Sequence, residues 1–507
     1  MMKSITNTLK LWHYGCALLT FIVCWLLQRR MSRRRYDLDK LPLIKFEEND
    51  TPERYVTDSK SLLHRGYVQY IKHGVPFRMR NPVDPDHPQV ILPFKYLSEV
   101  KMRPESVMSF QRFSRQAFLL DYINAPEPTD MAAHIVRGDL NKHLGTLAGQ
   151  MGVLARQAIH EGMPKCDDWT TFQPYFLFAN TIARVTSLAL AGPELAANEE
   201  WRNFMVTNTL TLMQTALEVR RKYPRHWRWV VRWIEPGARK ICEIRKRCAE
   251  LVAPSYQARL SRMASNEKPL VDGIQWLMNT VPGGKKPLLE IADEQLFLSV
   301  ASIHSSSAST LSFVYDLLDR PDVMDDILKE IRSVRGAKSG SSEWTKRDLD
   351  QLIKLDSFMK ESQRYYPAGL VAVQRSNARP YTFSDGLTIP ANTQCCFLNY
   401  ELNHDPEVYE DPETFDPYRF LRLREKVDPH KYHFAYVSED SINFGAGTYS
   451  CPGRHFASNE IKLILCELLL RYEMKWPDGG SRPPTMFHDF SSNPDPRADI
   501  LFRERKQ

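Results

Sequence analysis

The chain has 507 residues, 43% hydrophobic and 25% charged, which indicates a globular protein with a sizeable core and not a disordered one. A formal net charge of +7 is mild for this length and gives little support for a nucleic-acid partner. The nine cysteines are odd in number and contain no Cys-x-x-Cys pair, which favours a reducing compartment over a disulfide framework.

The first predicted element is an apolar run near the N-terminus. Residues 11–27, LWHYGCALLTFIVCWLL, are almost uniformly hydrophobic and lie at the short end of what spans a bilayer. Arginines follow directly, and no small-residue cleavage site comes after them. We therefore expect residues 1–35 to form an uncleaved membrane anchor with a basic stop. The excess of positive charge after the run predicts that residues 36–507 face the cytosol.

Helical patterns dominate the chain beyond residue 36, and no repeat or linker interrupts them. Apolar residues recur at three-to-four spacing in 200–223 and 239–263, and residues 289–321 fit one long helix that stops at Pro321. Strand-like pieces are few and short: HGVPFRM at 73–79, QVILPF at 89–94 and TQCCFLNY at 393–400. The patterns predict a mainly α fold with small β-sheets (α+β) in one domain.

A segment rich in tryptophan and arginine separates two of the predicted helices. Residues 223–236 read YPRHWRWVVRWIEP, in which tryptophans alternate with arginines: Trp227, Trp229, Trp233, Arg225, Arg228 and Arg232. Tryptophan rings and snorkelling arginines suit the headgroup layer of a membrane. A partly buried helix start with solvated arginines would produce the same pattern, so both interpretations stay open.

A single cysteine lies in the glycine-rich stretch FGAGTYSCPGRHFA, residues 444–457. Glycines let the backbone approach a flat ligand and adopt turns that other residues resist. Pro452 prepares the start of a helix from Arg454 onward, whose N-terminal partial positive charge would point at the sulfur. Such surroundings favour a thiolate, as a single axial ligand beneath a planar haem requires.

The stretch FGAGTYSCPGR resembles the haem-binding loop of the cytochrome P450 monooxygenases, and Cys451 matches the axial ligand of the iron in haem b. The resemblance implies the single-domain cytochrome P450 fold, with the haem between two long helices. It also places Phe444, Gly445, Gly447 and Tyr449 in the loop that surrounds the cofactor. Tyr449 stands where the family often has a basic residue, so it offers a hydrogen bond without a charge.

Two further motifs follow the family's order. ESQR, residues 361–364, resembles the family's E-x-x-R, and FDPYRF supplies a second arginine, Arg419. Glu361 and Arg364 are one helical turn apart and close enough to pair. The resemblance implies that these three residues hold the fold near the haem and take no part in the chemistry.

Arg375 and Arg137 match the family's arginines for the haem propionates. Arg375 follows the E-x-x-R helix by about ten residues, as the resemblance requires. Near Arg137 the family's usual tryptophan is replaced by Ala133, so this second match departs from the pattern.

The middle of the long helix carries ASIHSSS, residues 301–307, where small polar residues make room for a ligand and water. The family has an acid and a threonine where this chain has His304 and Ser305. Ser305 keeps a hydroxyl that can hydrogen-bond bound dioxygen and pass protons. Histidine side chains in general can take up and release protons near neutral pH, so His304 could shuttle protons in place of the acid, or it could be a buried histidine bonded to the backbone.

The resemblance implies oxidation of a small molecule with dioxygen. Electrons would come from NADPH through a separate cytochrome P450 reductase, with cytochrome b5 as a second candidate donor, because the chain has no dinucleotide fingerprint. Localisation would be the endoplasmic reticulum membrane, with one N-terminal span. An isomerase or dehydratase without oxygen insertion and a non-catalytic haem protein are the alternatives.

Segments such as GYVQYIKHGVPFRM, residues 66–79, resemble fungal secondary-metabolism enzymes related to ent-kaurene oxidase. That similarity implies a bulky, apolar terpenoid substrate: a diterpenoid, indole diterpenoid or meroterpenoid. We expect an apolar pocket lined by Ser307, Ala368, Leu370 and Val371. Alkaloid and polyketide-derived substrates stay open.

Overall fold

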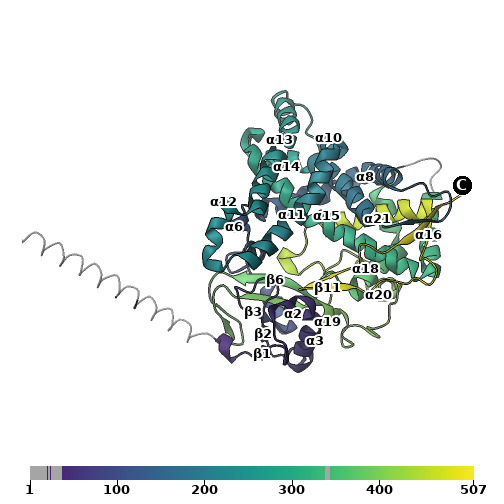
Figure 1. Ribbon diagram of the computed structural model, residues 1–507. Coiled ribbons are helices and arrows are strands. Elements are labelled where there is room, and N and C mark those ends of the chain that lie inside the picture. The colour runs from purple at the N-terminus through teal and green to yellow at the C-terminus, as the bar shows by residue number, and fades with distance from the viewer. Residues whose placement is uncertain (1–19, 21–22, 24–36, 337–342, 507) are drawn as a thin grey trace, which may run out of the picture.

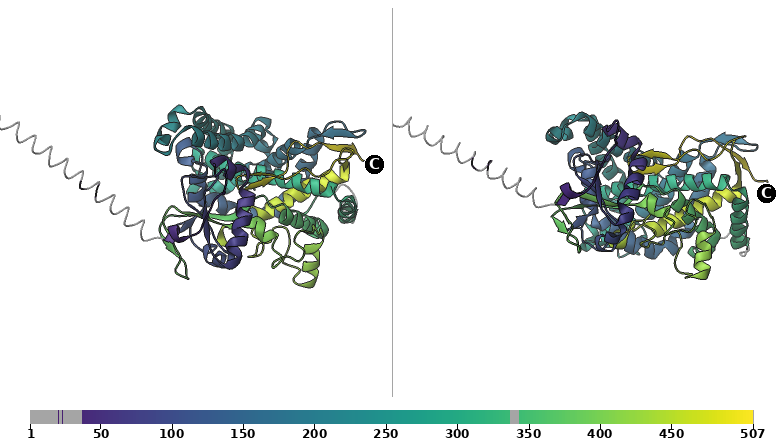
Figure 2. Two further views of the ribbon diagram at one scale, coloured as in Figure 1. Left: turned by 60° about the horizontal axis from the view of Figure 1, so that its bottom comes forward. Right: turned by 90° about the horizontal axis from the view of Figure 1, so that it is seen from below.

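The computed structural model describes residues 20, 23, 37–336 and 343–506. A helical part and a smaller part that contains the main sheet lie side by side (Figure 1), and the same division is visible in the turned views of Figure 2. No helix among the described residues is long and apolar enough to cross a membrane. The predicted membrane helix at 11–27 lies outside the described residues, apart from Thr20 and Val23.

Helices make up most of the fold, in the mainly α arrangement that the sequence predicts. The α-helices are α2 Pro52–Thr57, α3 Ser59–Gln69, α4 Leu97–Val100, α5 Phe110–Ala117, α6 Leu120–Ile123, α7 Asp130–Ile135, α8 Asn141–Gly162, α9 Tyr175–Ala191, α10 Pro193–Ala197, α11 Glu199–Lys222, α12 Val231–Ile234, α13 Pro236–Ala264, α14 Gly273–Asn279, α15 Leu288–Leu318, α16 Pro321–Gly336, α17 Lys346–Gln351, α18 Ile353–Tyr365, α19 Asn399–Asn403, α20 Arg419–Lys426 and α21 Arg454–Arg471. The helices predicted at 200–223, 239–263 and 289–321 correspond to α11, α13 and α15 and are confirmed.

The serine-rich middle of α15 stays helical because its hydroxyls bond back to the helix itself. Ser302 and Ser307 donate to the carbonyl oxygens of Leu298 and Ile303, at 2.7 and 2.6 Å. Serine side chains of this kind compete for backbone groups and weaken an isolated helix. Packing against α9, α11 and α13 on several sides holds α15 in place instead.

The strands are short and form one main sheet and three small ones. The main sheet has the order β1 Leu43–Ile44, β2 Phe77–Met79, β3 Gln89–Ile91, β9 Gln394–Leu398, β6 Val371–Asn377 and β4 Met108–Ser109. In the small sheets, β13 Ile500–Glu504 lies between β10 Tyr472–Lys475 and β5 Thr170–Phe172, β11 Met486–His488 pairs with β12 Ser491–Asn493, and β7 Tyr381–Thr382 pairs with β8 Thr388–Ile389. The strands predicted at 73–79, 89–94 and 393–400 correspond to β2, β3 and β9 and are confirmed.

The largest apolar core lies in the helical part, between α8, α9, α15 and α21. Helix α21 begins directly after the cysteine loop, and its residues from Phe456 to Leu469 are almost all buried in this core. The core therefore fixes the direction in which the loop presents Cys451. A second apolar cluster packs against one face of the main sheet and includes Val373 of β6 and Phe397 of β9.

Candidate active site: a cysteine loop facing the long helix

The loop before α21 is a tight turn that only glycine permits at two positions. Gly445 and Gly447 have φ values of 77° and 64°, in the left-handed region. A Cβ atom at Gly447 would overlap the carbonyl oxygen of Lys101, so the loop packs backbone against backbone there. The backbone N–H of Cys451 donates to the carbonyl oxygen of Phe444 at 2.7 Å and closes the turn.

Two opposite influences act on ionisation of the Cys451 thiol: burial opposes it, and nearby donors and charge favour it. Burial raises its pKa, whereas the N–H groups of Gly453 and Arg454 and the charge of Arg454 lower it. For comparison, burial raises the pKa of Cys395 to about 12, with only the charge of Arg375 acting against it. Two backbone donors aimed at one sulfur suit a thiolate that a metal ion keeps ionised.

Arg375 is a buried cation whose partner is missing. Its side chain is 2% exposed, and Nε and Nη2 form no hydrogen bond with any described residue. The remaining nitrogen, Nη1, donates to the neighbouring Gln374 carbonyl oxygen at 2.8 Å, and burial lowers the pKa of the group. An unpaired buried guanidinium is costly, and a carboxylate is its usual partner. A haem propionate would supply one.

A bulge in the sheet aims Arg375 inward. The register between β6 and β9 shifts between Ala372 and Arg375, and Val373 has a φ of 54°. Bulges redirect side chains and are common beside active sites. The guanidinium lies over the ring of Tyr449, 5.3 Å from its centre, and the Tyr449 hydroxyl accepts the N–H of Glu105 at 3.0 Å.

Arg137 lies in a π-helical turn, Val136–Leu140, that joins α7 to α8. It is exposed, and Nη2 donates to the carbonyl oxygen of Thr448 in the cysteine loop at 2.9 Å. Asn141 makes a second bond to the same loop, from Nδ2 to the Pro452 carbonyl oxygen at 3.3 Å. The structure therefore brings Arg137 beside the cysteine loop, as the resemblance implies, although most of its donors face solvent.

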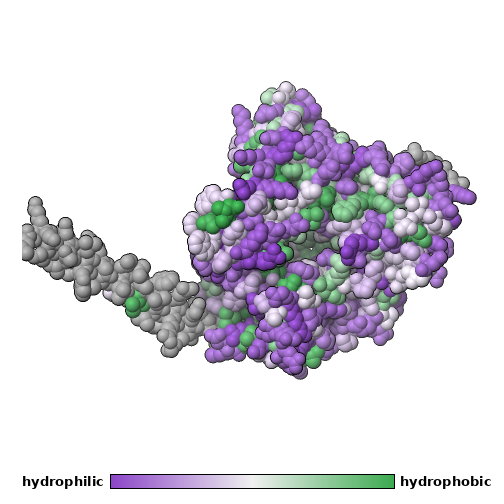
Figure 3. Space-filling view, in the orientation of Figure 1, coloured by the Kyte–Doolittle hydropathy of each residue, from purple (hydrophilic) through white to green (hydrophobic). Residues whose placement is uncertain are grey.

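One face of α15 is open to a hollow. Ala301 and Ser305 are exposed, although α15 is buried on its other sides. Figure 3 shows the hollow between the helical part and the sheet-containing part. The Ser305 hydroxyl donates to the Ala301 carbonyl oxygen at 3.1 Å and can turn toward a ligand. Ser307 is fully buried and bonded within the helix, so the expectation that it lines the pocket is wrong.

His304 points away from Ser305, toward α9 and α11. Its Nε2 lies 2.9 Å from the carbonyl oxygen of Val206, which can only accept, so Nε2 carries the proton. Nδ1 then accepts the Tyr175 hydroxyl at 3.0 Å. Both ring nitrogens are occupied, which is the geometry of the histidine bonded to the backbone. The arrangement gives His304 no direct path for a proton to Ser305.

The structure brings Glu361 and Arg364, near the C-terminal end of α18, together with Arg419, the first residue of α20. Arg364 makes two bonds to the Glu361 carboxylate, each of 2.8 Å, and Arg419 Nε lies 3.2 Å from it. Glu361 is fully buried and Arg364 is 1% exposed. The remaining donors of Arg364 reach the carbonyl oxygens of Asn403 and Pro412. The cluster ties α18 to the loop before α20 without facing the hollow.

The residues present fit a haem. A thiol with two N–H donors, an unpaired buried guanidinium and exposed small side chains on α15 are what a planar, dianionic iron cofactor requires. The sequence profile of the family described as Cytochrome P450 matches residues 166–502. The chain belongs to the cytochrome P450 family. It is therefore a monooxygenase that carries haem b, with its iron held by an axial cysteine thiolate.

Cytochrome P450 relatives from fungi match nearly the whole chain. "Cytochrome P450 monooxygenase CYP2" of Pyricularia oryzae is 67% identical over 86% of this chain and 91% of its own length. "Cytochrome P450 monooxygenase cheE" of Chaetomium globosum is 47% identical over 94% of each chain. "Pyrichalasin C-7 hydroxylase" of Pyricularia grisea is 39% identical over 91% of this chain and 92% of its own. These relatives carry other names than ent-kaurene oxidase, so that closer resemblance stays a prediction.

Among solved structures, retinoic acid-bound cyanobacterial CYP120A1 superposes with a TM-score of 0.67 at 15% identity, over 92% of this chain and 99% of that one. At this identity the likeness shows the cytochrome P450 fold alone. Together with the family match it confirms the predicted single-domain, mainly helical fold with small sheets.

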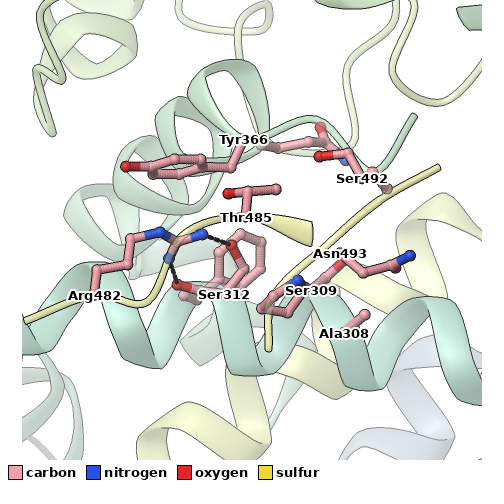
Figure 4. A pocket seen from close by; sticks show the side chains of 12 residues that line it. Ala308, Ser309, Ser312, Tyr366, Arg482, Thr485, Ser492 and Asn493 are labelled. Carbon is pink, nitrogen blue, oxygen red and sulfur yellow. Dashed lines mark hydrogen bonds between the residues drawn. The ribbon is translucent and has the colours of Figure 1, made fainter. Parts of the chain in front are cut away.

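Sequence reasoning missed one feature of this cytochrome P450, a small cavity beside the hollow, between α15 and the hairpin β11–β12 (Figure 4). Of the residues expected to line the pocket, Ala368 borders this cavity, whereas Leu370 is packed in a third apolar cluster with Cys396 and Leu398, on the other face of the main sheet. Ser309 and Ser312 also line it, and they continue the stripe of Ser305 at spacings of four and seven residues. The spacing of these serines was the sequence signal that could have indicated this cavity, because the hairpin residues on its other side are far away in the sequence.

Proposed function

We propose that this cytochrome P450 oxidises a bulky, mainly apolar secondary metabolite, with Cys451 as the axial ligand. The observation that carries this proposal is the Cys451 thiol, held by two backbone donors, together with the unpaired Arg375, whose guanidinium lies over Tyr449 of the same loop. When bound, haem supplies the oxygen-transfer chemistry, and the protein supplies position and dry surroundings. Arg375 and Arg137 would bind the propionates, and the exposed Ser305 hydroxyl would relay protons.

The substrate class rests on the relatives and on the resemblance seen in the sequence. The 39% identical relative is named as a pyrichalasin C-7 hydroxylase, which supports hydroxylation of a compound similar to pyrichalasin. A terpenoid is the second candidate, supported by the resemblance of residues 66–79 to enzymes related to ent-kaurene oxidase. Alkaloid and polyketide-derived substrates are further candidates. Incubation with pyrichalasin precursors and with diterpenoids, followed by mass spectrometry of the products, separates these candidates.

Electrons would come from NADPH through a separate cytochrome P450 reductase, with cytochrome b5 as a second donor. The sequence carries no dinucleotide-binding fingerprint, which supports a separate partner. The alternative of an isomerase or dehydratase differs in one measurable respect, since it would consume no dioxygen. Uptake of labelled dioxygen into product, with purified reductase and NADPH, tests the monooxygenase reaction.

We further propose that the chain is anchored in the endoplasmic reticulum membrane by residues 11–27, with the catalytic domain in the cytosol. A second contact would come from the exposed Trp227, Trp229, Trp233 and Ile234, with exposed fractions of 55%, 59%, 60% and 51%. These residues form an exposed surface on and beside α12, which we call the tryptophan patch. Lipid headgroups suit such a surface.

Only part of the arginine pattern around the tryptophan patch faces solvent. Arg228 is 5% exposed and paired with Asp86, so its role is structural. Arg225 and Arg232 are exposed, and the guanidinium of Arg232 lies 5.4 Å from the ring centre of Trp233. The interpretation as a partly buried helix start therefore fits Arg228, whereas Arg225 and Arg232 are placed as a membrane contact would require.

The decisive test of the proposed function is Cys451→Ser. We expect the purified variant to lose the thiolate-type absorbance of the carbon monoxide complex and all product formation, because an alcohol cannot replace the thiolate. Cys242→Ser, which alters a partly exposed thiol on α13, is the matched control and should keep both. An unchanged spectrum in Cys451→Ser would mean that another residue ligates the iron.

A further inference from the structure

The small cavity beside the hollow has a volume of about 30 Å³, which is room for one or two water-sized groups. Its walls are α15, the C-terminal end of α18 and the hairpin β11–β12 (Figure 4). The hairpin is fixed in place, because Ser492 N donates to the Ala368 carbonyl oxygen at 3.0 Å and Leu370 N donates to that of Phe490 at 2.8 Å. The cavity is therefore a built feature of the fold.

Polar side chains border this cavity without using their hydrogen-bonding groups. None of the following forms a side-chain hydrogen bond with another residue that the structure describes: Ser309, Gln363, Tyr366, Thr485, Ser492 and Asn493. Ser492 is 5% exposed and borders the cavity, whereas the other five side chains are partly or fully exposed and can also bond to solvent. Polar groups in such positions normally have a partner, and leaving them without one costs free energy. An occupant that offers hydrogen bonds, either water or a polar group, would therefore give Ser492 and its neighbours a partner inside the cavity.

The charges at the cavity wall cancel. Arg482 borders the cavity, but its Nη1 donates to Asp316 at 2.8 Å and its Nη2 to the Ser312 hydroxyl at 3.0 Å. Asp316 also accepts the Ser362 hydroxyl, and burial raises its pKa to about 6. The guanidinium covers the ring of Tyr366 at 3.7 Å, which fixes its position. Because no charge is left over, neither an anion nor a cation gains from binding, and the occupant is neutral.

The cavity belongs to the same side of α15 as the reaction space. Ser309 lies one turn beyond Ser305 on one face of the helix, and Ser305 is exposed to the hollow. Ala368 and Asn493 are exposed as well. A group that enters the cavity can therefore be part of the molecule that lies over Ser305.

We propose that this cavity binds a neutral oxygen substituent of the substrate, a hydroxyl or a carbonyl group, while the apolar skeleton lies over Ser305. Ser309, Ser492 and Asn493 supply the donors and acceptors. The inference rests on the proposed function and deepens it, since the substrate then carries a hydrogen-bonding oxygen at a fixed distance from the carbon that reacts. That oxygen decides which carbon faces the cofactor.

Binding of two matched probes to the full-length holoenzyme tests this inference. 1-Adamantanol and 1-methyladamantane have the same cage and differ only in a hydroxyl or methyl group, so the ratio of their dissociation constants reports on that group. The ratio is measured from the haem absorbance shift and by calorimetry. In Ser309→Ala and in Asn493→Ala the preference for the alcohol should fall about five-fold relative to wild type, as loss of one neutral hydrogen bond predicts.

Ser302→Ala is the matched control, because this serine lies on the same helix but bonds to Leu298 and does not border the cavity. It should leave the ratio unchanged. 1-Adamantanecarboxylate should not bind more tightly than 1-methyladamantane in any variant, because the cavity offers no net charge to the carboxylate. An unchanged ratio in both cavity variants, with normal haem content, would show that the cavity holds water only and would overturn the inference, as would a wild type that does not bind 1-adamantanol. Failure of the proposed function appears separately, as absent turnover with NADPH and reductase.

Discussion

Arg375 carries an unpaired buried charge, and the free energy that this charge costs depends on whether the cofactor is bound. Nε and Nη2 are buried without a partner among the described residues, and burial lowers the pKa of the group. In the apoprotein this arrangement opposes folding, whereas a bound propionate would satisfy it. The same residue should therefore destabilise one state of the protein and stabilise the other.

We predict that Arg375→Leu stabilises the apoprotein and weakens haem retention. The apoprotein should gain on the order of 1–3 kcal/mol, the desolvation penalty of a buried polar group without a partner. Unfolding of the apoprotein in urea and the rate of haem transfer to apomyoglobin measure the two effects. Arg379→Leu, an exposed arginine shortly after the same strand, is the control and should change neither quantity. Faster haem loss without apoprotein stabilisation would show that Arg375 already has a partner.

Glu460 is a second residue whose burial has a measurable consequence. It is fully buried on α21, accepts the Thr186 hydroxyl at 2.8 Å, and its other carboxylate oxygen has no described partner. Burial raises its pKa to about 8, so the folded state holds a proton that the unfolded chain releases near its ordinary pKa. The stability from this proton is fully present below about pH 4.5 and is lost as the pH rises through about 8.

We predict that Glu460→Gln, which mimics the protonated side chain, removes this loss. Between pH 5 and 8 the variant should gain stability over wild type by on the order of 1 kcal/mol per pH unit. Melting temperatures of both proteins at several pH values in that window provide the comparison. Glu467→Gln serves as a control, because the buried carboxylate of Glu467 forms a salt bridge with Arg156, unlike that of Glu460. A difference that stays constant with pH would mean that Glu460 is ionised in the folded protein.

At the scale of elements, the Glu361 cluster joins α18 to the loop before α20. Both carboxylate oxygens of Glu361 are used by Arg364, and Asp416 N donates to one of them at 2.9 Å. A buried ion pair of this kind adds little over an apolar contact, yet removing one partner strands the other charge. The cluster therefore specifies one geometry for the loop.

We predict that Glu361→Ala lowers the free energy of unfolding by about 3–5 kcal/mol, because it leaves Arg364 buried without its carboxylate. Glu413→Gln, an exposed acid of the same loop, should cost less than about 0.5 kcal/mol. Urea unfolding of both variants gives the difference. Equal stability of the two would show that the carbonyl oxygens around Arg364 suffice to hold its charge.

The elements differ in how far the sequence could specify them. Helices α11, α13 and α15 follow from apolar residues at helical spacing, a local signal that tertiary contacts reinforce. The bulge at Val373 could not be predicted in this way. A β-branched residue adopts a φ of 54° only where its neighbours in the fold hold it there, and its own sequence position does not show this. The direction of His304 depended on Tyr175 and Val206, which helical spacing cannot locate.

The candidate site exists only when distant segments of the chain meet. Arg137, Ser305, Arg375 and Cys451 come from four separate elements, and the small cavity adds a hairpin near the C-terminus. Motifs predicted the first four because the family keeps them in order. The cavity could not be predicted from the sequence, because its hairpin residues carry no motif and form a cavity wall only where the fold brings them beside α15.

The tryptophan patch bears on how the molecule would meet a membrane. The tryptophan patch is exposed, although aromatic rings of that size normally find cover, and it gathers on one short stretch around α12. If the patch enters lipid, the catalytic domain should bind membranes without the predicted anchor. The two contacts are separable by mutation, because the anchor and the patch lie in different parts of the sequence.

We predict that deletion of residues 1–28 weakens binding to vesicles of phosphatidylcholine and phosphatidylserine without abolishing it. Adding Trp227→Ser, Trp229→Ser and Trp233→Ser should then reduce the bound fraction by about ten-fold or more, since three rings lose their burial in lipid. Flotation of the vesicles measures the bound fraction. Phe176→Ser, another exposed aromatic outside the patch, is the control in the same truncated chain. Complete release on truncation alone would show that the patch faces water or a protein partner.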